Sequence, residues 1–121
     1  MSTAIVLFAH GSRDPHWHRP IQAVAEAVAR REPTLPVRCA YLELSTPSLP
    51  DAVADLLAEG AMHIRVFPVF LGVGKHARED LPALIQELRY RHPAVRFELL
   101  PSAGESPTLT ELLAELALGK G

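Results

Sequence analysis

The sequence predicts an α/β fold in which helices cover both faces of a parallel sheet of about four strands. Short apolar runs bounded by turn residues alternate with segments whose apolar residues recur at helical spacing. This alternation repeats about four times with short links. The 121 residues suffice for one core but not for two lobes with a cleft between them. We therefore expect a single three-layer domain over residues 1–118 and a frayed tail over 119–121.

The expected elements follow from these apolar patterns. Asp80 is expected to cap the third helix, with Pro82 near its first position. The apolar face of the last helix, which opens at Ser106 and Pro107, consists of Leu109, Leu112, Leu113 and Leu116. The expected strands cover residues 4–9, 37–42, 62–71 and 95–100, and the first three helices cover residues 20–31, 48–58 and 81–90.

Composition excludes several classes of function. The formal net charge is −2, whereas a nucleic-acid binder needs a clustered basic face. The single cysteine, Cys39, excludes an internal disulfide and a cysteine zinc cage, fits a reducing compartment and is expected in the core. The first residues lack a basic leader, and their apolar run is too short for a signal peptide or a membrane span. We therefore expect a cytoplasmic protein with no nucleic-acid or membrane partner.

Three residues with metal-binding side chains follow the first three expected strands. His10 follows the first strand, Glu43 the second, and His76 the glycine-containing segment after the third. All strand-to-helix loops of a parallel sheet share one edge. A flavodoxin-like order, with the first strand beside the third, places His10 and His76 together where ligands bind. Gly72 and Gly74 are expected to turn the chain sharply by adopting backbone angles that side chains forbid.

The residue types at this edge suit a metal ion. Two neutral imidazoles and a carboxylate bind cobalt, nickel, iron or zinc better than magnesium or calcium, and they can also move protons near neutral pH. The alternative for His76 is an ordinary strand-to-helix turn with a solvated histidine. The basic residues beside the histidines are Arg13, Lys75 and Arg78. They either bind the carboxylates of an anionic ligand or pair with the neighbouring Asp14, Glu79 and Asp80.

The remaining histidines have less specific interpretations. His16 and His18 are expected at the solvated rim of the site, with Trp17 between them as a lining residue of a pocket. Their spacing of two chelates a metal only on an extended segment. His63 and His92 fall at the opposite edge of the sheet, where we expect structural roles.

Three segments carry a family resemblance: residues 9–15, 42–49 and 67–82. Together they resemble the class II chelatases, most closely the sirohydrochlorin cobaltochelatases of the CbiX type. Residues 103–109 are also similar to the last loop and helix start of that family, so the resemblance covers nearly the whole chain.

The resemblance implies a chelatase-like lyase that inserts a divalent metal substrate into a sirohydrochlorin-type tetrapyrrole on the route to cobalamin or related cofactors. The metal is cobalt, and in some members nickel or iron. His10 and His76 match the active-site histidines, and Glu43 matches the acidic residue that joins them. Members with one lobe pair as homodimers. The three basic residues beside the histidines would hold carboxylates of the macrocycle. No nucleotide cofactor is expected, because no phosphate-binding glycine fingerprint follows the first strand.

Two other functions stay open on the sequence alone. A non-catalytic protein that carries metal or binds a tetrapyrrole would have the same motifs. A histidine phosphatase also has His-Gly after its first strand, but in that family an arginine precedes the histidine, where this chain has Ala9.

Overall fold

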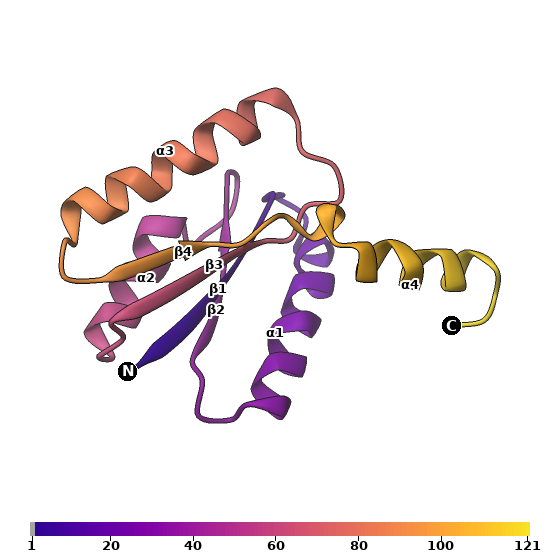
Figure 1. The fold of residues 1–121 in the computed structure, drawn as a ribbon, viewed down its shortest axis with the longest axis horizontal. Helices are drawn as coiled ribbons and strands as arrows, with labels where there is room; N and C mark the ends of the chain where they lie inside the picture. The colour runs from indigo at the N-terminus through magenta and orange to yellow at the C-terminus, as the bar shows by residue number, and fades with distance from the viewer. Residues whose placement is uncertain (1) are drawn as a thin grey trace.

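The strands form one parallel sheet in the order β2-β1-β3-β4 (Figure 1). The computed structural model describes residues 2–121, except for the side chain of His76. Strand β1 lies between β2 and β3, with Leu7 opposite both Cys39 and Phe67. This order confirms the prediction that the first strand lies beside the third. The strands are β1 (Thr3–Ala9), β2 (Val37–Tyr41), β3 (His63–Pro68) and β4 (Arg96–Leu99).

Helices cover both faces of this sheet, as predicted. Helix α1 packs on one face, and α2 and α3 pack on the other. None of the helices formed by residues 2–121 reaches the length and hydrophobicity of a membrane span. The helical elements are η1 (Pro15–His18), α1 (Arg19–Arg31), α2 (Leu49–Ala58), α3 (Lys75–Arg91), η2 (Ala103–Glu105) and α4 (Pro107–Ala117), of which η1 and η2 are short 3₁₀ helices.

Side chains of β1 alternate between two clusters of buried residues. Val6 and Phe8 belong to the larger cluster, which α2 and α3 complete, whereas Leu7 packs with Ile21 of α1 and Tyr41 of β2. Because side chains of a strand point to opposite faces in turn, a strand between two helical layers needs apolar residues at nearly every position. Each fully buried side chain of this size stabilises the fold by about 1.5–3 kcal/mol.

Helix α3 begins at Lys75, six residues before the predicted start at Leu81. Asp80 therefore does not cap the helix, and Pro82 lies inside it, where it cannot donate a hydrogen bond to the preceding turn. The prediction was wrong because the buried face of α3 already begins at Ala77 and continues through Leu81. Burial of this face outweighs the local cost of the proline. Strand β3 correspondingly ends at Pro68 rather than at residue 71.

The predicted use of Gly72 and Gly74 is also wrong. Gly74 is the N-cap of α3 with φ −70° and ψ 167°, an ordinary extended conformation. Positive φ among the glycines occurs instead at Gly60 and Gly119. An added Cβ would meet nothing within 4 Å at either Gly72 or Gly74. The turn into α3 therefore does not depend on the backbone freedom of glycine.

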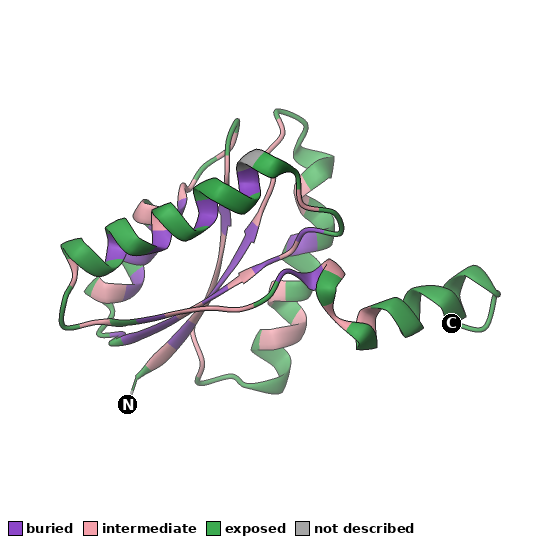
Figure 2. Ribbon diagram, turned by 45° about the horizontal axis from the view of Figure 1, so that its top comes forward, coloured by how far each residue is buried: buried purple, intermediate pink, exposed green. Residues whose placement is uncertain are grey.

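Helix α4 covers neither face of the sheet. It extends away from the rest of the chain (Figure 1), and Figure 2 shows it exposed over most of its length. Leu112, Leu113 and Leu116 are 48%, 40% and 53% exposed. The two faces of the sheet are thus covered by α1, α2 and α3, and not by α4, because η2 directs the chain away from the sheet after β4.

Candidate functional site

Three strand ends meet at one edge of the sheet. His10 follows β1, Glu43 follows β2 by one intervening residue, and His76 is the second residue of α3, which follows β3. Because β1 lies between β2 and β3, the segments that carry these three residues leave neighbouring strands at the same edge of the sheet. The side chain of His76 lies outside the described residues, so its part in a triad stays a prediction. Among the side chains that are described, no three His, Cys, Asp or Glu residues form a group able to hold a metal ion.

The His10 ring is half-buried and stacks on Phe70. The ring centroids are 4.4 Å apart and the planes are inclined by 30°. Phe70 is only 2% exposed and belongs to the larger core cluster. The imidazole is therefore supported by an aromatic ring of the core. The sequence does not reveal this role of Phe70, because an apolar run carries no sign of which neighbour each of its side chains contacts.

Gly11 brings the His10 loop onto the backbone of Glu43. An added Cβ at Gly11 would lie 1.4 Å from the Glu43 carbonyl oxygen, so only glycine fits there. The Leu42 amide, one residue before Glu43, donates a hydrogen bond of 2.9 Å to the carbonyl oxygen of Ala9, two residues before Gly11. The structure thus brings the backbones of His10 and Glu43 together, as the predicted site requires. The Glu43 side chain is exposed.

Ser45 links the same two loops through side-chain hydrogen bonds. Its hydroxyl donates to the Ser12 carbonyl oxygen at 2.7 Å, and the Ser12 amide donates to this hydroxyl at 3.0 Å. The His18 Nε2 atom lies 2.9 Å from the same oxygen, and the His18 ring stacks on Tyr41 with centroids 4.5 Å apart. His18, expected as a solvated or rim residue, is therefore not a freely solvated side chain but a partly buried residue at this edge. The only sign of this role of Ser45 in the sequence is a short polar side chain in a loop at this edge.

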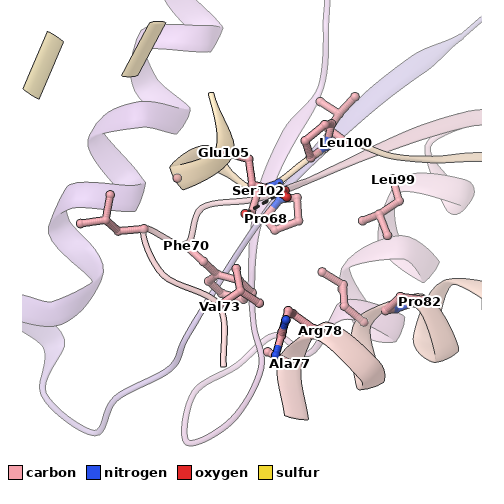
Figure 3. A pocket seen from close by; sticks show the side chains of 14 residues that line it. Pro68, Phe70, Val73, Ala77, Arg78, Pro82, Leu99, Leu100, Ser102 and Glu105 are labelled. Carbon is pink, nitrogen blue, oxygen red and sulfur yellow. Dashed lines mark hydrogen bonds between the residues drawn. The ribbon is translucent and has the colours of Figure 1, made fainter. Parts of the chain in front are cut away.

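Two cavities lie next to the stacked rings of His10 and Phe70. Phe70 lines the larger cavity, which has a volume of about 550 Å³ and lies between the start of α3 and residues 99–105. Figure 3 shows Val73, Arg78 and Leu99 among the side chains around it. Its lining is mostly apolar, with Arg78 as the basic residue. An apolar cavity with few charged groups is typical of a small-molecule site.

His10 itself lines the smaller cavity, which has a volume of about 360 Å³. His16 and Trp17 also line it, which confirms that Trp17 lines a pocket. The Trp17 indole N–H donates a hydrogen bond of 3.2 Å to the His10 carbonyl oxygen, although the side chain is 58% exposed. Trp17 is therefore held beside His10 while most of its indole faces solvent.

The three predicted anion-binding residues, Arg13, Lys75 and Arg78, are all exposed. Within the described side chains, none of them forms an ion pair with the acidic neighbours considered above. Asp14 instead accepts a hydrogen bond of 2.9 Å from the His16 amide. The alternative in which local pairing accounts for these basic residues thus finds no support, and a role in ligand binding stays a prediction.

His63 has a structural role at the opposite edge. Its Nε2 atom lies 3.0 Å from a carboxylate oxygen of Glu98, and its Nδ1 atom lies 3.2 Å from the Thr3 hydroxyl. Desolvation alone would raise the pKa of Glu98, but hydrogen bonds from His63 and Arg65, together with their charges, lower it below its ordinary value. This cluster joins β3 to its neighbours β1 and β4.

Cys39 and His92 also have structural surroundings. Cys39 is half-buried and packs against the α1 side of the core. Burial raises the pKa of its thiol, which disfavours the reactive thiolate. His92 ends α3, and its ring lies 6.3 Å from that of Phe97. Neither residue lies at the edge of the sheet that carries His10.

Comparison with known proteins identifies relatives over most of the chain. The CbiX family model matches residues 4–118. A sirohydrochlorin cobaltochelatase of Methanothermobacter thermautotrophicus is 37% identical over 81 residues, which cover 67% of this chain and 56% of the relative. One of Methanocaldococcus jannaschii is 37% identical over 89 residues, which cover 74% of this chain and 62% of the relative. The match thus spans less than two thirds of these curated relatives.

Solved structures have the same fold. A putative cobalamin biosynthesis CbiX protein from Marinobacter aquaeolei aligns with a TM-score of 0.85 and 31% identity, covering 98% of this chain and 96% of the other. The sirohydrochlorin chelatase SirB of Bacillus subtilis subspecies spizizenii, solved in complex with cobalt, aligns with a TM-score of 0.80 and 26% identity. That alignment covers 98% of this chain but 51% of SirB.

Proposed function

Because the chain belongs to the CbiX family of class II chelatases, we propose that it inserts a divalent metal ion into a sirohydrochlorin-type tetrapyrrole during the synthesis of cobalamin or a related cofactor. Cobalt is the proposed metal substrate, since curated relatives are named for cobalt and a structural neighbour was solved with it. Nickel and iron are further candidates, because their preferences for such ligands overlap. What supports the proposal is that β1, β2 and β3 are parallel neighbours whose carboxyl ends share one edge of the sheet, and that His10, Glu43 and His76 follow these three strands.

In this proposal His10, His76 and Glu43 bind the metal ion before its transfer. Neutral imidazole nitrogens and a carboxylate oxygen are common ligands of first-row divalent ions. Three protein ligands leave coordination positions open, so the nitrogens of a macrocycle can approach the ion. The close contact of Gly11 with the Glu43 backbone supports the pairing of two of these residues.

We propose that the macrocycle lies over this edge with its apolar body in reach of the two cavities. Stacking on exposed Trp17 and contact with the largely apolar lining suit a flat conjugated ring. Arg13, Lys75 and Arg78 would hold its peripheral carboxylates through charge-assisted hydrogen bonds. The position of Arg78 in the lining of the larger cavity supports this assignment.

Insertion replaces pyrrole N–H bonds by metal–nitrogen bonds, so the pyrrole protons must be accepted by a base. A histidine that has released the metal, or the Glu43 carboxylate, is suited to this step because imidazole and carboxylate groups both act as general bases in proteins. The divalent ion enters the macrocycle as the released protons leave, and its oxidation state does not change. No nucleotide takes part in this scheme.

We further propose that the protein acts in the cytoplasm as a homodimer. A macrocycle enclosed between two copies would bury more surface than a single lobe offers. The apolar face of α4, which is largely exposed in the single chain, supports a second copy as its partner.

The direct test mixes purified protein, Co²⁺ and metal-free sirohydrochlorin and follows the absorbance change of the macrocycle. We expect insertion faster than the spontaneous reaction, and loss of most of this acceleration in His10→Ala and His76→Ala. Wild-type protein that binds Co²⁺ or the macrocycle without accelerating insertion would indicate a non-catalytic binding protein. Unchanged rates in both variants would exclude these histidines from the reaction.

A further inference from the structure

We propose that Ser45 and His18 are positioning residues that hold Glu43 against the His10 loop and thereby set the affinity of the site for its divalent ion. This inference rests on the proposed role of His10 and Glu43 as metal ligands. Neither Ser45 nor His18 is proposed to touch the metal or the macrocycle. Both act through the backbone that carries Glu43.

The hydrogen-bonding capacity of the Ser45 hydroxyl is fully used. A hydroxyl has one proton to donate and two lone pairs that accept. The proton is donated to the Ser12 carbonyl oxygen, and one lone pair accepts from the Ser12 amide. The remaining lone pair must therefore accept from the His18 Nε2–H, which fixes the direction of that hydrogen bond. Stacking on Tyr41 holds the His18 ring in this orientation.

These contacts surround Glu43 on both sides. On one side, the Leu42 amide is hydrogen-bonded to the Ala9 carbonyl oxygen. On the other side, Ser45 is fixed to Ser12 and His18, and between them the Glu43 carbonyl oxygen lies against Gly11. The Glu43 backbone therefore has little freedom to move away from the His10 loop.

Leu44 indicates that this loop conformation is imposed by its surroundings. Its φ is 61°, in the left-handed region, and its side chain is 56% exposed. A branched residue adopts such a φ only when neighbouring contacts over-determine the backbone. The contacts of Ser45 immediately follow this strained residue. Loss of the Ser45 hydroxyl should therefore let the segment relax and move Glu43.

The test is a double-mutant cycle on Co²⁺ affinity, measured by calorimetry with the metal alone. The four proteins are wild type, Ser45→Ala, Glu43→Gln and the double variant. Groups that orient metal ligands typically change affinity by about 10–100-fold, so we expect Ser45→Ala to weaken Co²⁺ binding about tenfold. In the Glu43→Gln background, the same change should alter affinity less than about twofold, because the coupled ligand is already lost.

Matched variants separate positioning from general stability. Ser45→Thr retains the hydroxyl and should bind Co²⁺ nearly as tightly as wild type. His18→Gln, which retains a donor, should bind more tightly than His18→Leu. Ser2→Ala removes a serine hydrogen bond of similar length, 2.7 Å to the Gly60 carbonyl oxygen, at the opposite edge of the sheet, and should leave Co²⁺ affinity unchanged. Circular dichroism confirms folding of each variant, and the His18 pair provides the test if Ser45→Ala does not fold.

The outcomes distinguish this inference from the proposed function. Equal losses from Ser45→Ala in both backgrounds, or an equal loss in Ser2→Ala, would overturn the positioning role while insertion by wild type upholds the chelatase. Unchanged Co²⁺ affinity in Glu43→Gln would remove Glu43 as a ligand and overturn the inference with it. Wild-type protein that neither binds Co²⁺ nor inserts it would overturn both.

Discussion

Gly11 is the residue at which the structure of the site is most sensitive to a single added carbon. Its Cα lies against the Glu43 carbonyl oxygen, and an added Cβ would lie 1.4 Å from that oxygen. Backbone atoms cannot rotate aside as a flexible side chain can, so one of the two loops must move. Gly72, at the same edge, has open space around its Cα. The two glycines therefore make a matched pair.

We predict that Gly11→Ala destabilises the protein by about 1–3 kcal/mol, the usual cost of overpacking, and lowers Co²⁺ affinity because Glu43 is displaced. Gly72→Ala should stabilise it by up to about 1 kcal/mol through the reduced entropy of the unfolded chain. Urea denaturation gives both values, and calorimetry gives the affinity. Equal stability of the two variants would contradict the close contact at Gly11.

At the opposite edge of the sheet, the contribution of the Glu98 charge to stability can be tested. The pKa of Glu98 is lowered in the folded protein from its ordinary value of 4.5, so its ionised form favours folding. This contribution is fully present above the ordinary pKa and is lost as the pH falls through the lowered pKa. We predict that Glu98→Gln is less stable than wild type at neutral pH and that the difference disappears in acid. Urea denaturation over this pH range is the measurement, and a difference independent of pH would contradict the role of the charge.

At the scale of elements, α3 shows how a local signal is overridden. A proline at the first helical position is favourable, whereas inside a helix it removes a hydrogen bond. The sequence therefore favoured a start near Pro82, yet α3 begins at Lys75. Ala77 and Leu81, which are one turn apart, bury their side chains against the core. The stabilisation from this burial requires the sheet to be in place. The consequence is that His76 lies on a helix and not in a flexible loop.

The position of Pro82 can be tested by stability. If Pro82 lies inside α3, Pro82→Ala should restore the missing hydrogen bond and stabilise the protein by about 1–3 kcal/mol, part of the usual cost of an interior proline. Ala83→Gly, at the next exposed position, should destabilise it by about 1 kcal/mol. Urea denaturation measures both. A loss of stability in Pro82→Ala would instead indicate that the helix starts at the proline.

At the scale of the whole molecule, the leucines of α4 are largely uncovered in the single chain. Leu112 and Leu116 lie one turn apart on the same helical face and are both about half exposed. Exposed apolar surface of this kind commonly marks a protein interface. We therefore expect a second copy of the chain to cover this face, which extends away from the sheet of its own chain.

We predict that wild type has about twice the mass of one chain, which is 13.2 kDa, by light scattering after size exclusion. Leu112→Glu combined with Leu116→Glu should give a monomer, because two charges would have to be buried in the interface. The stability of the single chain should change little. Ala114→Glu adds a charge on the opposite face of α4 and should remain dimeric. A monomeric wild-type protein would contradict this arrangement.

The sequence by itself determined the alternation of strands and helices, the parallel sheet and the edge at which His10, Glu43 and His76 fall. These features depend on periodicities of apolar residues and on turn residues, which are local and can be followed along the chain. The order β2-β1-β3-β4 then agreed with the flavodoxin-like prediction. The resemblance in residues 9–15, 42–49 and 67–82 was confirmed by the match of the family model.

Only the tertiary structure decided where α3 begins, that α4 extends away from the sheet, and how the site loops are joined. Ser12 and Ser45 are 33 residues apart, and neither carries a local sign that it contacts the other. The same holds for Gly11, whose lack of a side chain is required by a carbonyl oxygen from another loop. Such contacts depend on the relative placement of segments that are distant in sequence, and burial and close packing in the folded chain determine that placement.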